Sequence, residues 1–275
     1  MKQLLQGVLV LTALLSCQTG WTAPSIAALP AGSWELASER NGIQVFSRNW
    51  PGSEVSAFKA VTTIHQPLAN VLAVLSDATS CMNWVEDCAE SGAIGPQNFA
   101  ERKAYMRSNL PWPFSDRFVE LNIRSKVKYP KSEQSPRVIE IIMQVAQNNE
   151  KETPEDSVRI EHSFSHYILR ALDDTRTEIE WTQHTEPAGY LPNWLINSRL
   201  TDFPVATLGN LRTLCASPRY QSVELVLDQD GQIQNIRLED GSLLLSSGAP
   251  FSSRSFAYDI SLPQSGYTLA DIAQR

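Results

Sequence analysis

Hydrophobic and polar residues alternate over much of the chain, which is the pattern of β-strands with one buried face and one face in water. Residues 118–125 show this pattern clearly, and their central positions read Val119, Glu120, Leu121, Asn122, Ile123 and Arg124. Segments rich in Gly, Pro, Asn and Asp interrupt the alternation and mark turns. The pattern therefore predicts strands at residues 43–48, 55–65, 88–94, 99–107, 117–129, 137–147, 157–169 and 175–186.

Two segments change to the spacing of amphipathic helices. The first follows Pro67 and is short, with apolar positions at Leu68, Val71, Leu72 and Leu75. The second is the last regular element, residues 192–214, with apolar positions at Ile196, Leu200, Phe203, Leu211 and Leu214. Pro204 lies inside it and predicts a kink, because proline lacks the N–H group of an interior helix bond.

These elements predict an α+β fold in which a curved antiparallel β-sheet wraps around one long C-terminal α-helix. One face of such a sheet is apolar and must be covered. A strongly curved sheet that grips a single helix can leave a hydrophobic cavity between the two, and cavities of this kind bind apolar ligands.

The first residues predict export. Lys2 precedes an apolar run at residues 4–16, which is too short to cross a bilayer and is typical of a secretory signal peptide. The sequence Leu14-Leu15-Ser16-Cys17 resembles a bacterial lipobox, whereas small residues such as Ala23 suit ordinary signal peptidase. We therefore expect a signal peptide at residues 1–23. The mature protein is then periplasmic or secreted, or it is an outer-membrane lipoprotein that contacts the membrane through an anchor at Cys17.

Charge and cysteine content narrow the function further. The formal net charge of −7 disfavours nucleic acid and anionic membrane surfaces as partners.

Apart from Cys17 the chain has three cysteines, so at most one internal disulfide can form. Cys81 and Cys88 would lie about 10.5 Å apart on an unbroken helix, so a disulfide between them requires a turn. We predict this disulfide, with two buried thiols as the alternative, and a core position for Cys215.

The sequence gives no positive sign of catalysis. It contains no Gly-rich phosphate loop, no Gly-x-Ser-x-Gly elbow and no zinc-type cysteine pair. His162 and His166 share a strand face, but about 13 Å of strand separates them, too far for one metal ion without another segment. His184 and Glu186 also share a face, and no third ligand follows nearby. We therefore predict no catalytic residue, no metal site and no cofactor.

Strand parity supplies candidate binding residues instead. Side chains of a strand point alternately to its two faces, so every second residue of 137–147, 157–169 and 175–186 shares a face. A few polar groups on these apolar walls would orient the head of a buried hydrocarbon ligand. The predicted ligand-binding residues are Ile141, Met143, His162, Phe164, Trp181, Gln183, Leu200 and Phe203. The alternative is that these residues only pack against the C-terminal helix.

Four motifs resemble, in order and spacing, those of the START lipid-transfer domains of the helix-grip superfamily: GIQVFSRNWPGS, VLAVLSDATSCMNWV, LPWPFSDRF and EPAGYLPNWLIN. The resemblance covers about Trp34 to Cys215 and places a START-like domain at residues 30–216. Bacterial members typically have Asp-Arg-Asp in place of Asp116-Arg117-Phe118 and Asp-Pro-Gly-Gly in place of Glu186-Pro187-Ala188-Gly189. The resemblance implies a sheet closed by the C-terminal helix around a tunnel for one lipid-like molecule.

The resemblance also suggests a role for the LPWPFSDRF motif. Trp112 and Phe114 would lie on a stiff loop near an end of the sheet, and Asp116 and Arg117 would anchor this loop where the strand begins. The alternative is that Trp112 lies in the core and the charge pair is solvated.

The remaining segment, residues 217–275, lies beyond the resemblance. VELVLDQDGQIQNIRL predicts a hairpin that turns at Asp230-Gly231, followed by a partly disordered end. We expect the chain to be a non-enzymatic carrier or sensor of a lipid or other hydrophobic small molecule in the bacterial envelope. The alternatives are a helix-grip enzyme, such as a cyclase or hydrolase acting on a hydrophobic substrate, and an adaptor whose tail binds a partner. The sequence leaves the ligand and the oligomeric state open.

Overall fold

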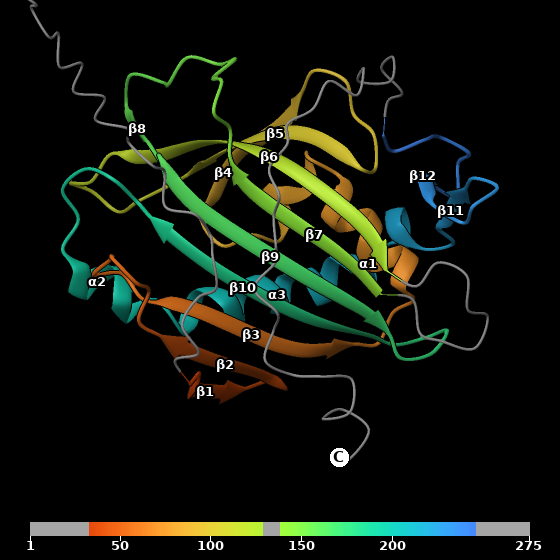
Figure 1. The fold of residues 1–275 in the computed structure, drawn as a ribbon, viewed down its shortest axis with the longest axis horizontal. Coiled ribbons are helices and arrows are strands. Elements are labelled where there is room, and N and C mark those ends of the chain that lie inside the picture. The colour runs from red at the N-terminus through yellow and green to blue at the C-terminus, as the bar shows by residue number, and fades with distance from the viewer. Residues whose placement is uncertain (1–32, 129–137, 246–275) are drawn as a thin grey trace, which may run out of the picture. The chain divides into compact units, whose positions relative to one another are not determined.

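One large β-sheet forms the framework of the computed structural model, which describes residues 33–128 and 138–245. Nine strands lie side by side in the order β1-β2-β3-β10-β9-β7-β6-β5-β4, all antiparallel, and the short β8 pairs in parallel with β6 (Figure 1). The strands are β1 (Glu35–Arg40), β2 (Ile43–Arg48), β3 (Ala57–Ile64), β4 (Cys88–Ile94), β5 (Glu101–Ser108), β6 (Asp116–Lys128), β7 (Val138–Val145), β8 (Ser157–Arg159), β9 (His162–Ala171) and β10 (Thr177–Glu186). The large antiparallel sheet and the α+β class are as predicted.

Two strands differ from the prediction. The alternation of residues does not predict β1, because this edge strand leaves most of its side chains exposed. The strand predicted at residues 157–169 is instead two strands, β8 and β9. The chain leaves the regular ladder between them, and the N–H of Ile160 donates to the carbonyl of Phe118 at 2.8 Å.

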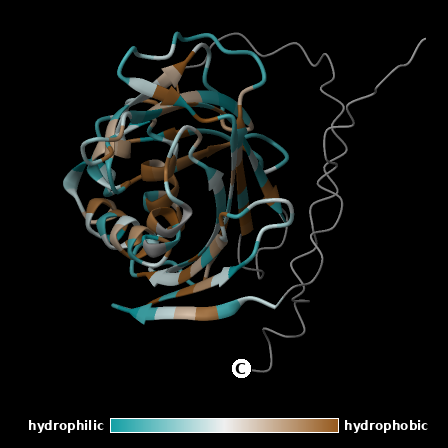
Figure 2. Cartoon of the chain, turned by 90° about the vertical axis from the view of Figure 1, so that its left-hand side faces the viewer, coloured by the Kyte–Doolittle hydropathy of each residue, from teal (hydrophilic) through white to brown (hydrophobic). Residues whose placement is uncertain are grey.

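Helices cover one face of the sheet, which we call the inner face. Residues directly opposite one another on neighbouring strands share a face, and one inner row, Ile139, Leu169 and Ile179, is fully buried. Helices α1 (Leu68–Ser76) and α3 (Asp202–Cys215) lie inside the curve of the sheet (Figure 2). Leu72 of α1 and Leu208 of α3 belong to the same hydrophobic core as this row.

The C-terminal helical segment differs from the single kinked helix predicted for residues 192–214. It consists of α2 (Asn193–Ser198) and α3, which residues 199–201 separate. Inside a helix, Pro204 would remove a hydrogen bond to the carbonyl of Leu200 and clash with it, whereas the first turn of α3 needs no such bond. The break therefore precedes Pro204. In the described part of the chain, no helix is long and apolar enough to span a membrane.

The turn required for a disulfide follows the short 3₁₀ helix η1 (Ser80–Asn83). Asp87 adopts a positive φ of 62° there, and the chain reverses into β4. The structure joins Cys81 to Cys88 in a disulfide, with the two Cα atoms 6.2 Å apart. Cys215 is a buried free thiol, and burial raises its pKa to about 12.

Residues after α3 extend the core rather than leave it. They form a 3₁₀ turn η2 (Pro218–Tyr220) and a hairpin of β11 (Glu224–Leu227) and β12 (Ile233–Arg237). Ile233 and Ile236 are buried in the main hydrophobic core. The hydroxyl of Tyr220 donates to the carboxylate of Asp77, just after α1, at 2.9 Å. The hairpin itself agrees with the prediction for this segment. Its packing into the main hydrophobic core is not part of that prediction.

The closed end of the sheet is the end where β10 begins. There Thr177 donates a hydrogen bond to the backbone carbonyl of Gln66 at 2.9 Å, and Gln221 donates to the carbonyl of Cys215 at 2.8 Å. The predicted signal peptide at residues 1–23 and the predicted disordered end after residue 245 lie outside the described residues.

Candidate functional site

The inner face is less buried toward the end of the sheet where β10 ends. Ile139, Leu169 and Ile179 near the closed end are inaccessible to solvent. Farther along the same face, apolar and polar side chains alike are only partly buried, among them Leu121, Met143, Gln183 and Thr185. A close-packed core leaves few such gaps. This half-buried region, which we call the open half, is the candidate site.

Four of the predicted binding residues share the inner face of the sheet, and two lie on the helical segment that packs against the core. Ile141 and Met143 of β7 and Trp181 and Gln183 of β10 share this face, because Tyr167 and Ser165 of β9 pair with both strands. Leu200 and Phe203, at the junction between α2 and α3, pack against the same core while remaining partly exposed.

Trp181 connects the sheet to α3. Its ring stacks on Tyr167 with centroids 5.2 Å apart, and its indole N–H donates to the Ser165 hydroxyl at 2.8 Å. The ring of Phe203 lies 5.9 Å from Trp181 and 6.3 Å from Phe58. Since the polar atom of Trp181 is satisfied within the sheet, the neighbourhood of Phe203 is essentially apolar.

Two predicted residues lie on the wrong face. Phe164 is opposite His184 and His162 is opposite Glu186, so both side chains are on the outer face, away from Trp181 and Gln183. Phe164 contacts Trp50 there at 6.2 Å between centroids. The inner residues of β9 are Ser163, Ser165, Tyr167 and Leu169. The prediction fails because apolar Phe164 suggests the buried side, whereas serines occupy it in the open half.

A hollow of about 280 Å³ lies where β10 ends, and none of the predicted ligand-binding residues lines it. Its lining comes from the turn between β2 and β3, from the loop between β10 and α2, and from α2, and consists of Gly52, Ser53, Glu54, Val55, Glu186, Pro187, Ala188, Gly189, Leu191 and Ile196. Sequence reasoning missed this hollow, although two of the quoted motifs, ending in WPGS and beginning with EPAG, form most of its wall.

Arg117 links the LPWPFSDRF motif to the lining of the hollow. Its guanidinium donates to the carbonyl of Ala188 at 2.9 Å and also to the carbonyls of Pro187 and Ser115. Burial lowers the pKa of Arg117, and the adjacent Asp116 carboxylate opposes this shift. A Cβ atom at Gly189, where φ is +63°, would lie 3.4 Å from Nη2 of Arg117. A buried arginine therefore fixes the backbone of the 187–189 loop.

Two aromatic side chains project from the joined loops. Trp112, in the loop before β6, is 92% exposed, and Tyr190, in the loop after β10, is 89% exposed. The carboxylate of Asp116 accepts hydrogen bonds from Arg107 at 3.1 Å and from the N–H of Leu110 at 3.2 Å, which holds the first loop. The structure thus decides between the two interpretations of this motif: Trp112 lies on the surface and Arg117 is buried.

His184 is buried on the outer face and stacks on Trp50 at 4.4 Å between ring centroids. Burial lowers its pKa and favours the neutral ring. In residues 33–128 and 138–245, no group of three or more His, Cys, Asp or Glu side chains is placed to hold a metal ion.

Comparison with known proteins identifies relatives over most of the chain. The family model described as START domain matches residues 27–206. An uncharacterized protein of Pseudomonas aeruginosa is 26% identical over 211 residues, which are 76% of this chain and 98% of that protein. The phosphatidylcholine transfer protein of Bos taurus is 24% identical over 177 residues, which are 62% of this chain and 78% of that protein.

Solved structures share the fold. A fragment of the STAR-related lipid transfer protein from Xanthomonas axonopodis superposes with a TM-score of 0.60 at 24% identity, covering 67% of this chain and 99% of that chain. Human STARD10 superposes with a TM-score of 0.58 at 17% identity, covering 66% of this chain and 72% of that chain.

Proposed function

This chain belongs to the START domain family, and on that premise we propose that it binds one lipid or other hydrophobic small molecule between the inner face of its sheet and α3. It carries or senses this molecule without catalysis. Two relatives, the bovine phosphatidylcholine transfer protein and the Xanthomonas STAR-related lipid transfer protein, are lipid transfer proteins by name. The ligand-binding residues of this proposal are Ile141, Met143, Trp181, Gln183, Leu200 and Phe203.

The observation that carries the proposal is the open half of the inner face. Leu121, Met143 and Phe203 keep part of their surface accessible, and the hollow of about 280 Å³, which other residues line, lies where β10 ends. A bound hydrocarbon would cover this surface, at about 25 cal/mol per Å² of apolar area removed from water. The junction between α2 and α3 would act as the lid, because Leu200 and Phe203 lie on it.

The exposed aromatic residues support contact with a membrane during loading. Tryptophan and tyrosine favour the interface between lipid and water, since each has an apolar ring and a polar group. Trp112 and Tyr190 flank the loops that Arg117 joins beside the hollow. In this acidic protein, aromatic contact rather than net charge would bring the opening to the bilayer.

We place this activity in the bacterial envelope. The apolar run at residues 4–16 supports export, and a disulfide between Cys81 and Cys88 suits an oxidising compartment. The protein would be periplasmic or secreted, or an outer-membrane lipoprotein if Cys17 is acylated.

Native mass spectrometry of protein purified from its own host tests the proposal. We expect one bound lipid per chain, which delipidation removes and incubation with lipid vesicles restores. The lipid recovered after incubation with the protein should be chemically unchanged. This result would distinguish a carrier from a helix-grip enzyme. Protein that carries no hydrophobic molecule and takes none from mixed vesicles would refute lipid binding, and a chemically altered lipid would refute the non-catalytic assignment.

A further inference from the structure

Arg102 is a charged residue on the inner face of the sheet. The register places it in a row that runs across five strands, each residue opposite the next: Arg102, Ile123, Met143, Ser165 and Gln183. This row lies where the fully buried core ends and the open half begins. Two members of the row, Met143 and Gln183, are among the proposed ligand-binding residues.

The guanidinium of Arg102 is buried without a matching anion. The residue is 4% exposed, and its Nη1 donates to the carbonyl of Phe99 and to the hydroxyl of Ser125, each at 2.9 Å. Its Nη2 is buried and has no hydrogen-bond partner among residues 33–128 and 138–245. Among the described residues, no carboxylate forms an ion pair with it. Burial lowers the pKa of Arg102 to about 10, so the group keeps its positive charge at neutral pH.

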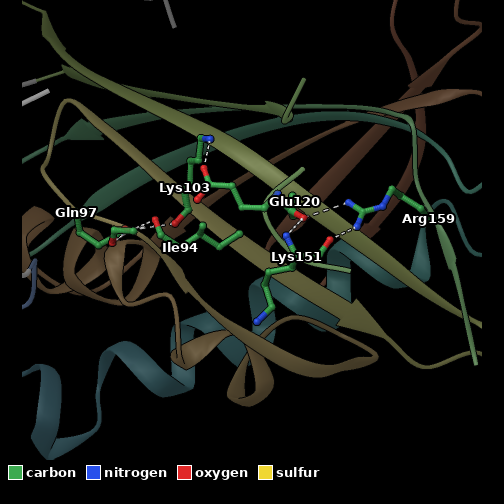
Figure 3. A network of polar contacts seen from close by, with 8 residues as sticks. Ile94, Gln97, Lys103, Glu120, Lys151 and Arg159 are labelled. Atoms are coloured by element: carbon green, nitrogen blue, oxygen red, sulfur yellow. Dashed lines mark hydrogen bonds and ion pairs between the residues drawn. The ribbon is translucent and has the colours of Figure 1, made fainter. Parts of the chain in front are cut away.

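Two other buried charges of this protein, Glu120 and Arg117, each have several hydrogen-bond partners. Glu120 on the outer face is 1% exposed, and its carboxylate accepts hydrogen bonds from the N–H groups of Glu150 and Lys151 at 2.9 and 2.8 Å and from Arg159 at 3.2 Å (Figure 3). Arg117 donates to four backbone carbonyls, those of Ser115, Asp116, Pro187 and Ala188. A buried charge without such compensation is costly, and its remaining donor needs an acceptor. Arg102 therefore has a buried donor atom, Nη2, that lacks an acceptor among the described residues, whereas Glu120 and Arg117 are hydrogen-bonded.

The surface next to Arg102 suits a hydrocarbon chain. Ala104 is two residues farther along β5 on the same face, and it lies opposite Leu121. Both are apolar and partly exposed, as is Met143. An amphiphile with its tail along these residues would have to extend its polar end inward to Arg102, whose bonds to Phe99 and Ser125 lie toward the closed end.

We propose that Arg102 binds the anionic group of the ligand, so that the ligand class is an acidic amphiphile with a carboxylate or phosphate group. This inference rests on the proposed function and narrows it. The oxyanion accepts hydrogen bonds from Nη2 and compensates the buried charge, as in other guanidinium–oxyanion pairs. A fatty acid and an acidic phospholipid both supply this chemistry, and the test below separates them.

The test uses the mature chain and pairs of ligands that share tails. Oleic acid is compared with oleyl alcohol, and dioleoyl phosphatidic acid with dioleoylglycerol, by displacement of a fluorescent hydrocarbon probe. For wild type we expect the acid of at least one pair to bind about tenfold more tightly than its neutral partner. Arg102→Gln should lower this ratio to about one while keeping affinity for the neutral ligand, and Arg102→Lys should keep part of the preference. Arg124→Gln, on the outer face of the neighbouring strand, is the matched control and should behave as wild type.

The outcomes separate this inference from the proposed function. If none of the four ligands displaces the probe, lipid binding itself fails. If neutral and acidic partners bind equally to wild type, or Arg102→Gln keeps the preference, the anion site is refuted. A second measurement uses only the wild-type protein, so it remains informative if Arg102→Gln does not fold. Carboxyl-labelled oleic acid bound to wild type should remain ionised in its ¹³C spectrum below its ordinary pKa, and protonation at or above that pKa would refute the contact.

Discussion

Phe203 tests whether the open half is a ligand space or an incompletely packed core. We consider Phe203→Trp beside Leu208→Trp, two substitutions on the same helix that introduce the same side chain. Leu208 is fully buried, so added volume there should cost about 1–3 kcal/mol of unfolding free energy. Phe203 is partly exposed, and at a wall of a ligand space the cost should stay within about 0.5 kcal/mol. An indole that displaces one or two ligand methylenes, at about 0.8 kcal/mol each, should weaken lipid binding roughly 4- to 15-fold.

The assay combines thermal melting of delipidated protein with lipid loading from vesicles. At about 2–4 °C per kcal/mol for a domain of this size, Leu208→Trp should lower Tm by several degrees and Phe203→Trp by little. Loading should fall for Phe203→Trp at unchanged Tm. If Phe203→Trp lowers the Tm of the empty protein as much as Leu208→Trp does, Phe203 is a core residue and the assignment of the open half fails.

Three further predictions concern the loops and the outer face. Arg117→Met leaves the carbonyls of the 187–189 loop without their donor, and we expect a loss of about 3 kcal/mol in urea unfolding and faster proteolysis of this loop; an unchanged unfolding midpoint would contradict the anchoring role. For His184, burial lowers the folded-state pKa, opposed by Glu186 and the Val55 carbonyl and reinforced by His162. The unfolded chain then binds the proton more readily, so stability is complete above about pH 6.5 and declines as the pH falls toward the folded-state pKa. Melting curves from pH 7 to 5 should show a decline in Tm for wild type and a smaller decline for His184→Gln. Equal declines in the two proteins would mean that other groups cause the effect. Trp112→Ala should leave Tm unchanged, because the side chain is 92% exposed, and reduce flotation with phosphatidylcholine vesicles severalfold; undiminished flotation would argue against membrane contact through this loop.

The sequence predicts those parts of the fold that depend on one strand or helix at a time. β6 and β7 follow from alternation, because mostly apolar residues on each strand face the core and mostly polar residues lie on the opposite face. The same rule fails for β9, since Phe164 packs on the outer face against Trp50, a residue far away in the sequence. Local hydrophobicity cannot reveal such a partner.

Contacts between distant segments explain the other differences. Arg117 reaches carbonyls 70 and 71 residues away, and only the folded chain brings the LPWPFSDRF and EPAGY motifs together. Parity could have placed Arg102 on the inner face, because it is two residues from Ala104 on one strand. The lack of an anionic partner for Arg102 cannot be predicted from the sequence pattern, because it depends on which side chains surround the guanidinium in the folded chain.

The C-terminal hairpin makes local stability uneven along the sheet. Tyr220, Ile233 and Ile236 tie the residues after α3 to the core beside α1, at the closed end. Opening that end would require breaking the core itself, whereas the side chains that the structure describes between residues 187 and 203 are all partly or fully exposed. Fluctuations should therefore concentrate at the segment over the open half, as sub-global opening does in other proteins. Amide hydrogen exchange would register this as fast exchange in α2 and slow exchange in β12 and α1, so that a guest molecule can pass in or out while the cooperative unit stays folded.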